Sequence, residues 1–168
     1  METIFDWHQL QIPIDGQPYK LELLDTGSGI YAYLQHQTIE CGDCFFLVYS
    51  TSSKSSFDKI PKIHQQILNN YGSHIKSEIP MILVGNKTDL SAREVSKTAG
   101  HALAEKLGCQ FMETSAKTGE NVRDALCAVV RRVPPNTPAK QIDEGKGKKS
   151  RFQDILLSFF NCNRKGES

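Results

Sequence analysis

The first third of the chain shows two patterns of apolar residues that are typical of strands. Residues 7–14 and 19–24 (YKLELL) alternate apolar and polar positions, and Asp15-Gly16 between them is typical of a tight hairpin turn. Residues 44–49 (CFFLVY) and, later, 80–85 (PMILVG) are continuous apolar runs. Such runs predict parallel strands that are covered on both faces.

Helical periodicity separates these strands. It predicts a helix over 57–71, which Ser55 or Ser56 would cap, and a helix over 92–107 that Gly108 ends. A short strand at Phe111-Met112 and a helix over 119–132 follow. Residues 25–43 begin with DTGSG and predict a loop and a short helix. This order of elements predicts an α/β fold with a parallel sheet flanked by helices and an antiparallel edge hairpin.

The last part of the chain differs in composition. Residues 134–151 are rich in Pro, Gly and Lys and are predicted to be a flexible basic linker after a domain over 1–133. Residues 152–168 form a tail, in which Phe152, Ile155, Leu156, Phe159 and Phe160 have helical spacing. We therefore predict an amphipathic helix there.

Composition and charge exclude several classes of protein. The net charge of +1 gives no support to nucleic-acid binding, but residues 133–168 carry seven Lys or Arg against four Asp or Glu. A basic tail points to an anionic membrane surface. The five cysteines are irregularly spaced and predict no disulfide framework, which favours a cytoplasmic setting.

The strongest chemical motif is Asn86-Lys87-Thr88-Asp89, directly after a predicted buried strand. Ligands of α/β sheets lie beyond the carboxyl ends of the strands. A carboxylate at Asp89 could accept hydrogen bonds from the N1–H and the amino group of guanine, a pair of donors that adenine lacks. Asn86 could tie loops together, and the Lys87 stem could cover the ring. The alternative is a polar loop that only ends the strand.

A second motif, Glu113-Thr114-Ser115-Ala116-Lys117, follows the next strand. Small residues there would allow the backbone to approach a ligand, and the Ala116 amide could donate to a base carbonyl. The alternative is a Ser/Thr turn that caps the following helix.

The segments LLDT, FFLVYS, SFDKI, PMILVGNKTDL and ETSAKTGENV, in this order over about residues 3–132, resemble the Ras family of small GTPases. The resemblance implies a Ras-like, P-loop NTPase-type fold that binds GTP or GDP with Mg²⁺. It also implies effector proteins, exchange factors and GTPase-activating proteins as partners. The guanine pocket would consist of Asn86, Lys87, Asp89, Ser115, Ala116 and Lys117.

The resemblance also shows what departs from the family pattern. Asp25 resembles the family's aspartate that supports Mg²⁺, and Thr3 resembles the threonine of its first switch. Ser28-Gly29 stands where the family has the Gly-Gln pair that contacts the γ-phosphate and orients water. No catalytic residue is assigned, and whether the chain hydrolyses GTP stays open.

The phosphate-binding motif G-x-x-x-x-G-K-[ST] does not occur. The resemblance then predicts an incomplete sheet, without the family's first strand, P-loop and first helix. That strand would lie between the strand ending at Asp25 and the strand over 44–49. The sheet must close up, recruit another strand or remain unstable.

Several functions remain open from the sequence. The first is a Ras-type small GTPase in signal transduction; the alternative is a pseudo-GTPase interaction module that binds effectors without nucleotide cycling. A third is a fragment of a longer parent. Cys162 with the tail helix and basic linker could attach the chain to the inner face of the plasma membrane by palmitoylation. The alternative is a tail that packs on its own domain or stays disordered.

Overall fold

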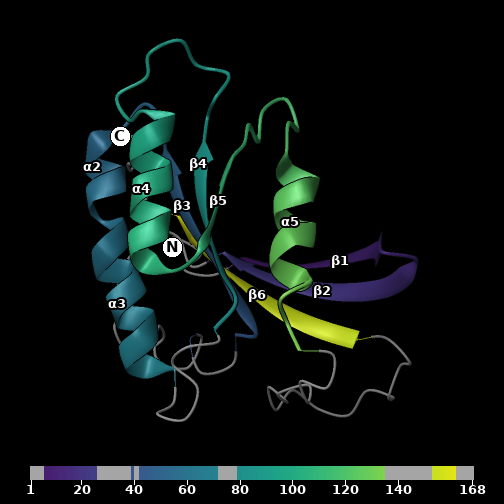
Figure 1. The fold of residues 1–168 in the computed structure, drawn as a ribbon. Helices are drawn as coiled ribbons and strands as arrows, with labels where there is room; N and C mark the ends of the chain where they lie inside the picture. Colours follow the sequence, from purple (N-terminus) through teal and green to yellow (C-terminus); the bar gives the residue numbers. More distant parts are fainter. Residues whose placement is uncertain (1–5, 26–38, 40–41, 72–78, 135–152, 162–168) are drawn as a thin grey trace.

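The computed structural model describes residues 6–25, 39, 42–71, 79–134 and 153–161. Within these ranges the centre of the molecule is a six-stranded sheet with the order β1-β2-β6-β3-β4-β5 (Figure 1). The β1–β2 pair is antiparallel and every other pair is parallel, as the sequence predicted. The strands are β1 Asp6–Ile14, β2 Gln17–Asp25, β3 Cys44–Ser50, β4 Met81–Asn86, β5 Gln110–Glu113 and β6 Gln153–Asn161.

The β1–β2 hairpin forms at the predicted turn. Asp15 and Gly16 both have positive φ values, 52° and 78°, which match the twist of a two-residue hairpin. The Arg131 guanidinium donates to both carboxylate oxygens of Asp15, at 2.8 and 2.7 Å. This contact joins the turn to the helix on one face of the sheet.

Helices cover both faces of the sheet (Figure 1). On one face lie α2 Lys54–Asp58, α3 Ile60–Asn70 and α4 Lys97–Leu107, and on the other lies α5 Val122–Val130. Alternate residues of β3 divide between two cores: Phe46 packs with α5, and Phe45 packs with α3 and α4. Every residue of β3 is buried, which explains the continuous apolar run in its sequence.

The helix boundaries differ from the predictions. The single helix expected over 57–71 is two helices, and its cap is Ser53, whose side chain accepts from the Ser56 amide. Pro61 in the first turn of α3 fits a new helix start, because proline lacks the amide that the first turn leaves unpaired. Gly108 ends α4 with a φ of 69°, as predicted.

The prediction of a helix in the tail is wrong. Gln153–Asn161 is a strand, β6, which pairs in parallel with β2 over Gln153–Phe159 and with β3 over Leu157–Asn161. Short apolar runs do not distinguish a buried strand from a helix by periodicity alone. Here the inner edges of β2 and β3 offer backbone hydrogen-bond partners on both sides, so the segment forms a strand rather than a helix.

The sheet is therefore not open between β2 and β3. Of the three outcomes that the sequence left open, recruitment of another strand is the one that occurs. A membrane-binding helix over the same residues is incompatible with their place in the sheet. Thr3, Cys162 and most of the predicted loop over 25–43 and linker over 134–151 lie outside the described residues.

Candidate functional site

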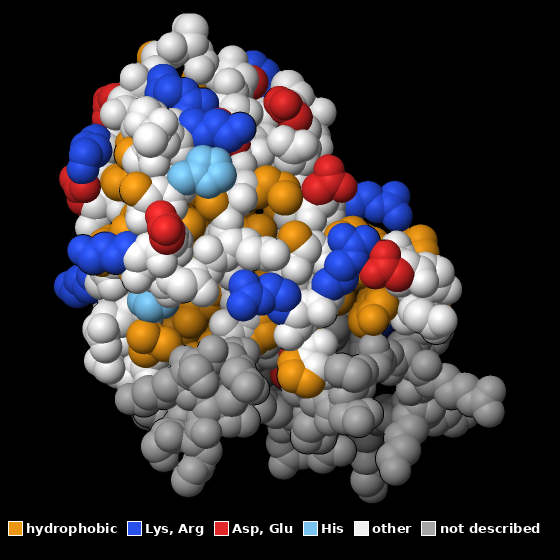
Figure 2. All heavy atoms as spheres, in the orientation of Figure 1, with side chains coloured by type: hydrophobic (Ala, Val, Ile, Leu, Met, Phe, Trp, Pro, Cys, Tyr) orange, Lys and Arg blue, Asp and Glu red, His pale blue; other side chains and the backbone are white. Residues whose placement is uncertain are grey.

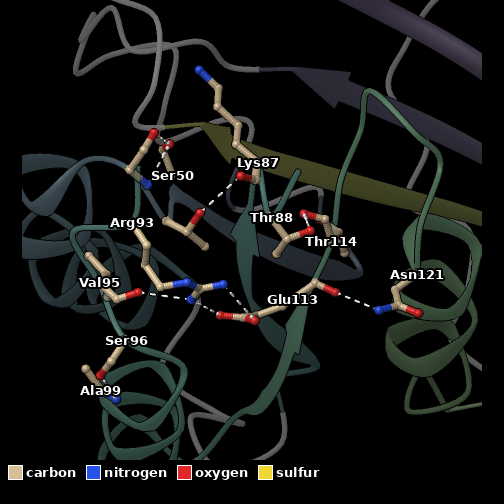
Figure 3. A network of polar contacts seen from close by, with 12 residues as sticks. Ser50, Lys87, Thr88, Arg93, Val95, Ser96, Ala99, Glu113, Thr114 and Asn121 are labelled. Atoms are coloured by element: carbon tan, nitrogen blue, oxygen red, sulfur yellow. Dashed lines mark hydrogen bonds and ion pairs between the residues drawn. The ribbon is translucent and has the colours of Figure 1, made fainter. Parts of the chain in front are cut away.

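The two motif loops lie side by side at the carboxyl ends of two neighbouring parallel strands. They follow β4 and β5, which pair in parallel with Gly85 opposite Glu113. The Thr114 amide donates to the Gly85 carbonyl at 2.9 Å, and the Thr88 amide and hydroxyl both donate to the Thr114 carbonyl, at 3.2 and 3.1 Å. Figure 3 shows the Thr88–Thr114 contact at the centre of this network. The structure therefore brings the two motifs together, as their positions after neighbouring strands predicted.

Asn86 joins the two loops. Its Oδ1 accepts a hydrogen bond from the Ala116 amide at 3.0 Å and one from the Thr114 hydroxyl at 3.4 Å. The Ala116 amide, which the sequence suggested as a donor to a base carbonyl, is thus directed at Asn86. A guanine carbonyl at this place would have to share or replace that contact.

Asp89 is held by the second loop. The Ser115 hydroxyl, itself buried, donates to Asp89 Oδ1 at 2.6 Å, and Lys117 Nζ lies 3.9 Å from Oδ2. The hydrogen bond from Ser115 is the main cause that lowers the pKa of Asp89, with smaller contributions from Lys117 and Lys87. The Asp89 side chain is 15% exposed and the Lys117 side chain 80%. The carboxylate is consequently ionised at neutral pH and fixed in orientation.

Lys87 has an unusual backbone conformation. Its φ of 69° lies in the left-handed region, which side-chain-bearing residues seldom adopt. The Thr51 hydroxyl donates to the Lys87 carbonyl at 3.2 Å, and the Thr51 amide donates to the Asn86 carbonyl at 2.9 Å. Figure 3 draws the contact at the Lys87 carbonyl. Strained residues of this kind persist where the surroundings fix them, as these contacts do.

An ion pair that was not predictable from the sequence supports the second loop. Arg93 donates to both carboxylate oxygens of Glu113, at 2.6 and 3.2 Å, and to the Val95 carbonyl at 3.1 Å (Figure 3). The Asn121 side-chain amide donates to the Glu113 carbonyl at 3.0 Å. Glu113, the last residue of β5, thus contacts both the segment before α4 and the start of α5.

Asp25 ends β2 at the same edge of the sheet. It lines a cavity of about 330 Å³ together with Asn86, Thr114 and Ala116. His8 of β1 and apolar residues of β2, β3, β4 and α5 form the rest of the wall. Mg²⁺ in nucleotide sites is often held by one or two carboxylates and by the ligand's phosphates, so a single aspartate fits such a site. Among the described residues no cluster of three or more His, Cys, Asp or Glu could hold a metal by itself.

Comparison with known proteins decides the family. The model of the Ras family matches residues 1–135. The chain belongs to the Ras family of small GTPases. It is 44% identical over 149 residues to Protein ras-2 of Neurospora crassa, covering 78% of this chain and 65% of that protein. It is 45% identical over 146 residues to Ras-like protein 1 of Pyricularia oryzae, covering 77% of this chain and 61% of that protein.

The name of a third relative describes a circular permutation of the chain. Circularly permutated Ras protein 1 of Dictyostelium discoideum is 38% identical over 136 residues, which are 79% of this chain and 16% of that protein. The chain thus spans less than two thirds of the length of these curated relatives. The family and the sheet flanked by helices agree with the prediction from the sequence.

Proposed function

We propose that this Ras-family chain binds guanine nucleotides, with Asp89 reading the base. The observation that supports this most directly is the orientation of Asp89 by the Ser115 hydroxyl at 2.6 Å. A carboxylate held in this way presents its acceptors to a ligand without first having to be ordered, and such preorganisation favours binding. Asn86, Lys87, Ala116 and Lys117 complete the proposed pocket around it.

Mg²⁺ would accompany a bound nucleotide. Asp25 is the described residue that we propose supports it, and Thr3 is the residue that the family resemblance adds. Mg²⁺ would neutralise phosphate charge there. We propose signal transduction through effector and regulator proteins as the cellular role, in keeping with the family.

A direct titration tests the proposal. Purified chain is titrated with fluorescent GDP and GTP in the presence and absence of Mg²⁺, and ATP and GTP are compared as competitors. We expect GTP to displace the probe at a concentration at least about tenfold lower than ATP, because adenine would leave the Asp89 carboxylate unpaired. Equal competition by ATP would contradict the proposal, provided that circular dichroism shows folded protein.

A second candidate is a non-catalytic module that binds effectors or regulators without nucleotide cycling. One feature of the sequence favours it: Ser28-Gly29 stands in the place of the family's Gly-Gln pair. Single-turnover measurement of phosphate release from GTP separates the two candidates. Release at the rate of GTP alone would favour the module.

The third relative's name suggests a permuted order of elements, and we propose that this chain has one. In the family the first strand lies between the strands that correspond to β2 and β3. Here β6, the last described strand in the sequence, occupies that place (Figure 1). Moving the first strand from the front of the chain to the back would produce this order.

Membrane attachment through the tail stays a prediction. The amphipathic helix on which it partly rested is a strand, β6, and the prediction now depends on the basic residues of the linker alone. Among the described residues no helix is both long and apolar enough to cross a bilayer. Acidic and basic side chains are interspersed over the face drawn in Figure 2, without a broad field of one sign.

A further inference from the structure

Thr51 binds both ends of the loop that carries Asp89. It directly follows β3 and is buried, with 1% of its surface exposed. At the start of the loop its amide donates to the Asn86 carbonyl at 2.9 Å. At the end of the loop its carbonyl accepts from the Glu94 and Val95 amides, at 2.9 and 3.0 Å. The backbone of one buried residue thus holds the two ends of the loop together.

The Thr51 side chain adds a contact of a different kind. Its hydroxyl donates to the Lys87 carbonyl at 3.2 Å, and the Leu90 amide donates to the same carbonyl at 3.1 Å. The second contact is the hydrogen bond of a four-residue turn, in which Thr88 and Asp89 are the central residues. The carbonyl that anchors this turn is therefore held by the hydroxyl of a buried residue.

The Lys87 carbonyl needs such a contact because of the conformation of its residue. The φ of 69° at Lys87 is one that a residue with a side chain seldom adopts without surrounding contacts. If Lys87 returned to a more common conformation, the turn would change direction and Asp89 would move away from the Ser115 hydroxyl. The fraction of molecules that present the carboxylate correctly would fall, and the affinity for a ligand falls with that fraction.

We infer that Thr51 is a positioning residue of the proposed guanine pocket. Its hydroxyl, acting through the Lys87 carbonyl, fixes the turn that directs Asp89 at the base. Thr51 belongs to neither motif and lies 36 residues before Lys87 in the sequence. The inference rests on the proposed function, because Asp89 is the residue proposed there to recognise guanine.

Three variants of the full chain test the inference: Thr51→Val, Thr51→Ser and, as a control, Ser56→Ala. Valine has the shape of threonine without the hydroxyl, and serine keeps the hydroxyl. Ser56 is a second buried residue, whose hydroxyl accepts from the Ser50 amide at 3.0 Å and donates to the Ser53 carbonyl at 2.7 Å. Calorimetry measures guanosine binding, and NMR titration of the Asp89 carboxyl carbon measures its pKa without ligand. Circular dichroism melts establish that each variant is folded.

We expect Thr51→Val to weaken guanosine binding about fivefold, which corresponds to one hydrogen bond. It should also raise the pKa of Asp89 towards its ordinary value, because the carboxylate spends less time against the Ser115 hydroxyl. Thr51→Ser and Ser56→Ala should stay within about twofold of wild type, because both keep the contact at the Lys87 carbonyl.

A second comparison tests the route through Lys87. Glycine adopts a positive φ without steric cost, so a Lys87→Gly chain does not need the hydroxyl to hold this conformation. In that background Thr51→Val should weaken guanosine binding by less than about twofold. An equal loss in both backgrounds would show that the hydroxyl does not act through the Lys87 conformation and would overturn the inference.

Two further results would also overturn it. One is a folded Thr51→Val protein with the guanosine affinity and the Asp89 pKa of wild type. The other is a Thr51→Ser protein that loses as much affinity as Thr51→Val. If wild-type protein bound no guanosine, the proposed function would be refuted, and an Asp89 pKa that Thr51→Val leaves unchanged would then separately refute the positioning of the carboxylate by Thr51.

Discussion

Removal of β6 should unfold the domain. A variant that ends at Gln141 lacks the strand between β2 and β3, which pairs over seven positions with β2 and over five with β3. Each residue of a parallel strand presents its amide and carbonyl to one neighbour or the other, so about ten backbone groups of β2 and β3 lose their partners. At the lower limit of about 1 kcal/mol for each unpaired buried group, the loss is about 10 kcal/mol.

That loss is comparable with the whole stability of a domain, about 5–15 kcal/mol. We therefore expect the shortened chain to show no cooperative transition in a thermal or urea melt followed by circular dichroism. The matched control ends at Asn161, retains β6 and should melt as the full chain does. If the chain without β6 melted cooperatively within a few degrees of the control, the assignment of β6 as a structural strand of the sheet would be wrong.

Three further predictions concern packing and titration. Gly100→Ala should destabilise the domain by about 1–3 kcal/mol in urea melts, because an added Cβ would lie 2.4 Å from Phe111 Cζ. Gly108→Ala meets no atom within 4 Å and should lose only about 1 kcal/mol, through its φ of 69°. Tyr49→Phe should leave the free energy of unfolding unchanged or raise it by up to about 1 kcal/mol, because the buried Tyr49 hydroxyl has no hydrogen-bond partner among the described residues. A decrease of more than about 1 kcal/mol would show that this hydroxyl does make a stabilising hydrogen bond. Since the Ser115 hydroxyl lowers the pKa of Asp89, guanine preference should be constant from pH 7 to 5 and be lost only as the pH falls below about 4. Ser115→Ala should move this loss to higher pH, and NMR titration of the Asp89 carboxyl carbon measures the shift.

The sequence predicted the parts of the fold that local pattern determines. The hairpin at Asp15-Gly16, the buried strands and the left-handed end of α4 at Gly108 each follow from a short-range rule. The same holds for the adjacency of the two motif loops, because parallel strands end at one edge. The break before Pro61 was missed, although proline within a predicted helix is a signal for it.

The strand β6 was not predictable in the same way. Its run ILLSFF fits a helix and a strand equally well, and the choice depends on the inner edges of β2 and β3, more than a hundred residues away in the sequence. The contacts between Arg93 and Glu113 and between Thr51 and Lys87 are also long-range. Each of these contacts joins two segments that are distant in the sequence, and no periodic pattern of residues predicts that they meet.

The central claim is that the Asp89 carboxylate recognises the two donors of guanine, and a change of base preference tests it most directly. Xanthine has a carbonyl where guanine has its amino group, so the side-chain amide of an Asp89→Asn variant could donate to that carbonyl. Calorimetry with guanosine and xanthosine should show that wild type prefers guanosine and that Asp89→Asn prefers xanthosine. Asp124→Asn, the same change at an exposed residue of α5, should behave as wild type. An unaltered preference for guanosine in the folded Asp89→Asn protein would contradict the claim.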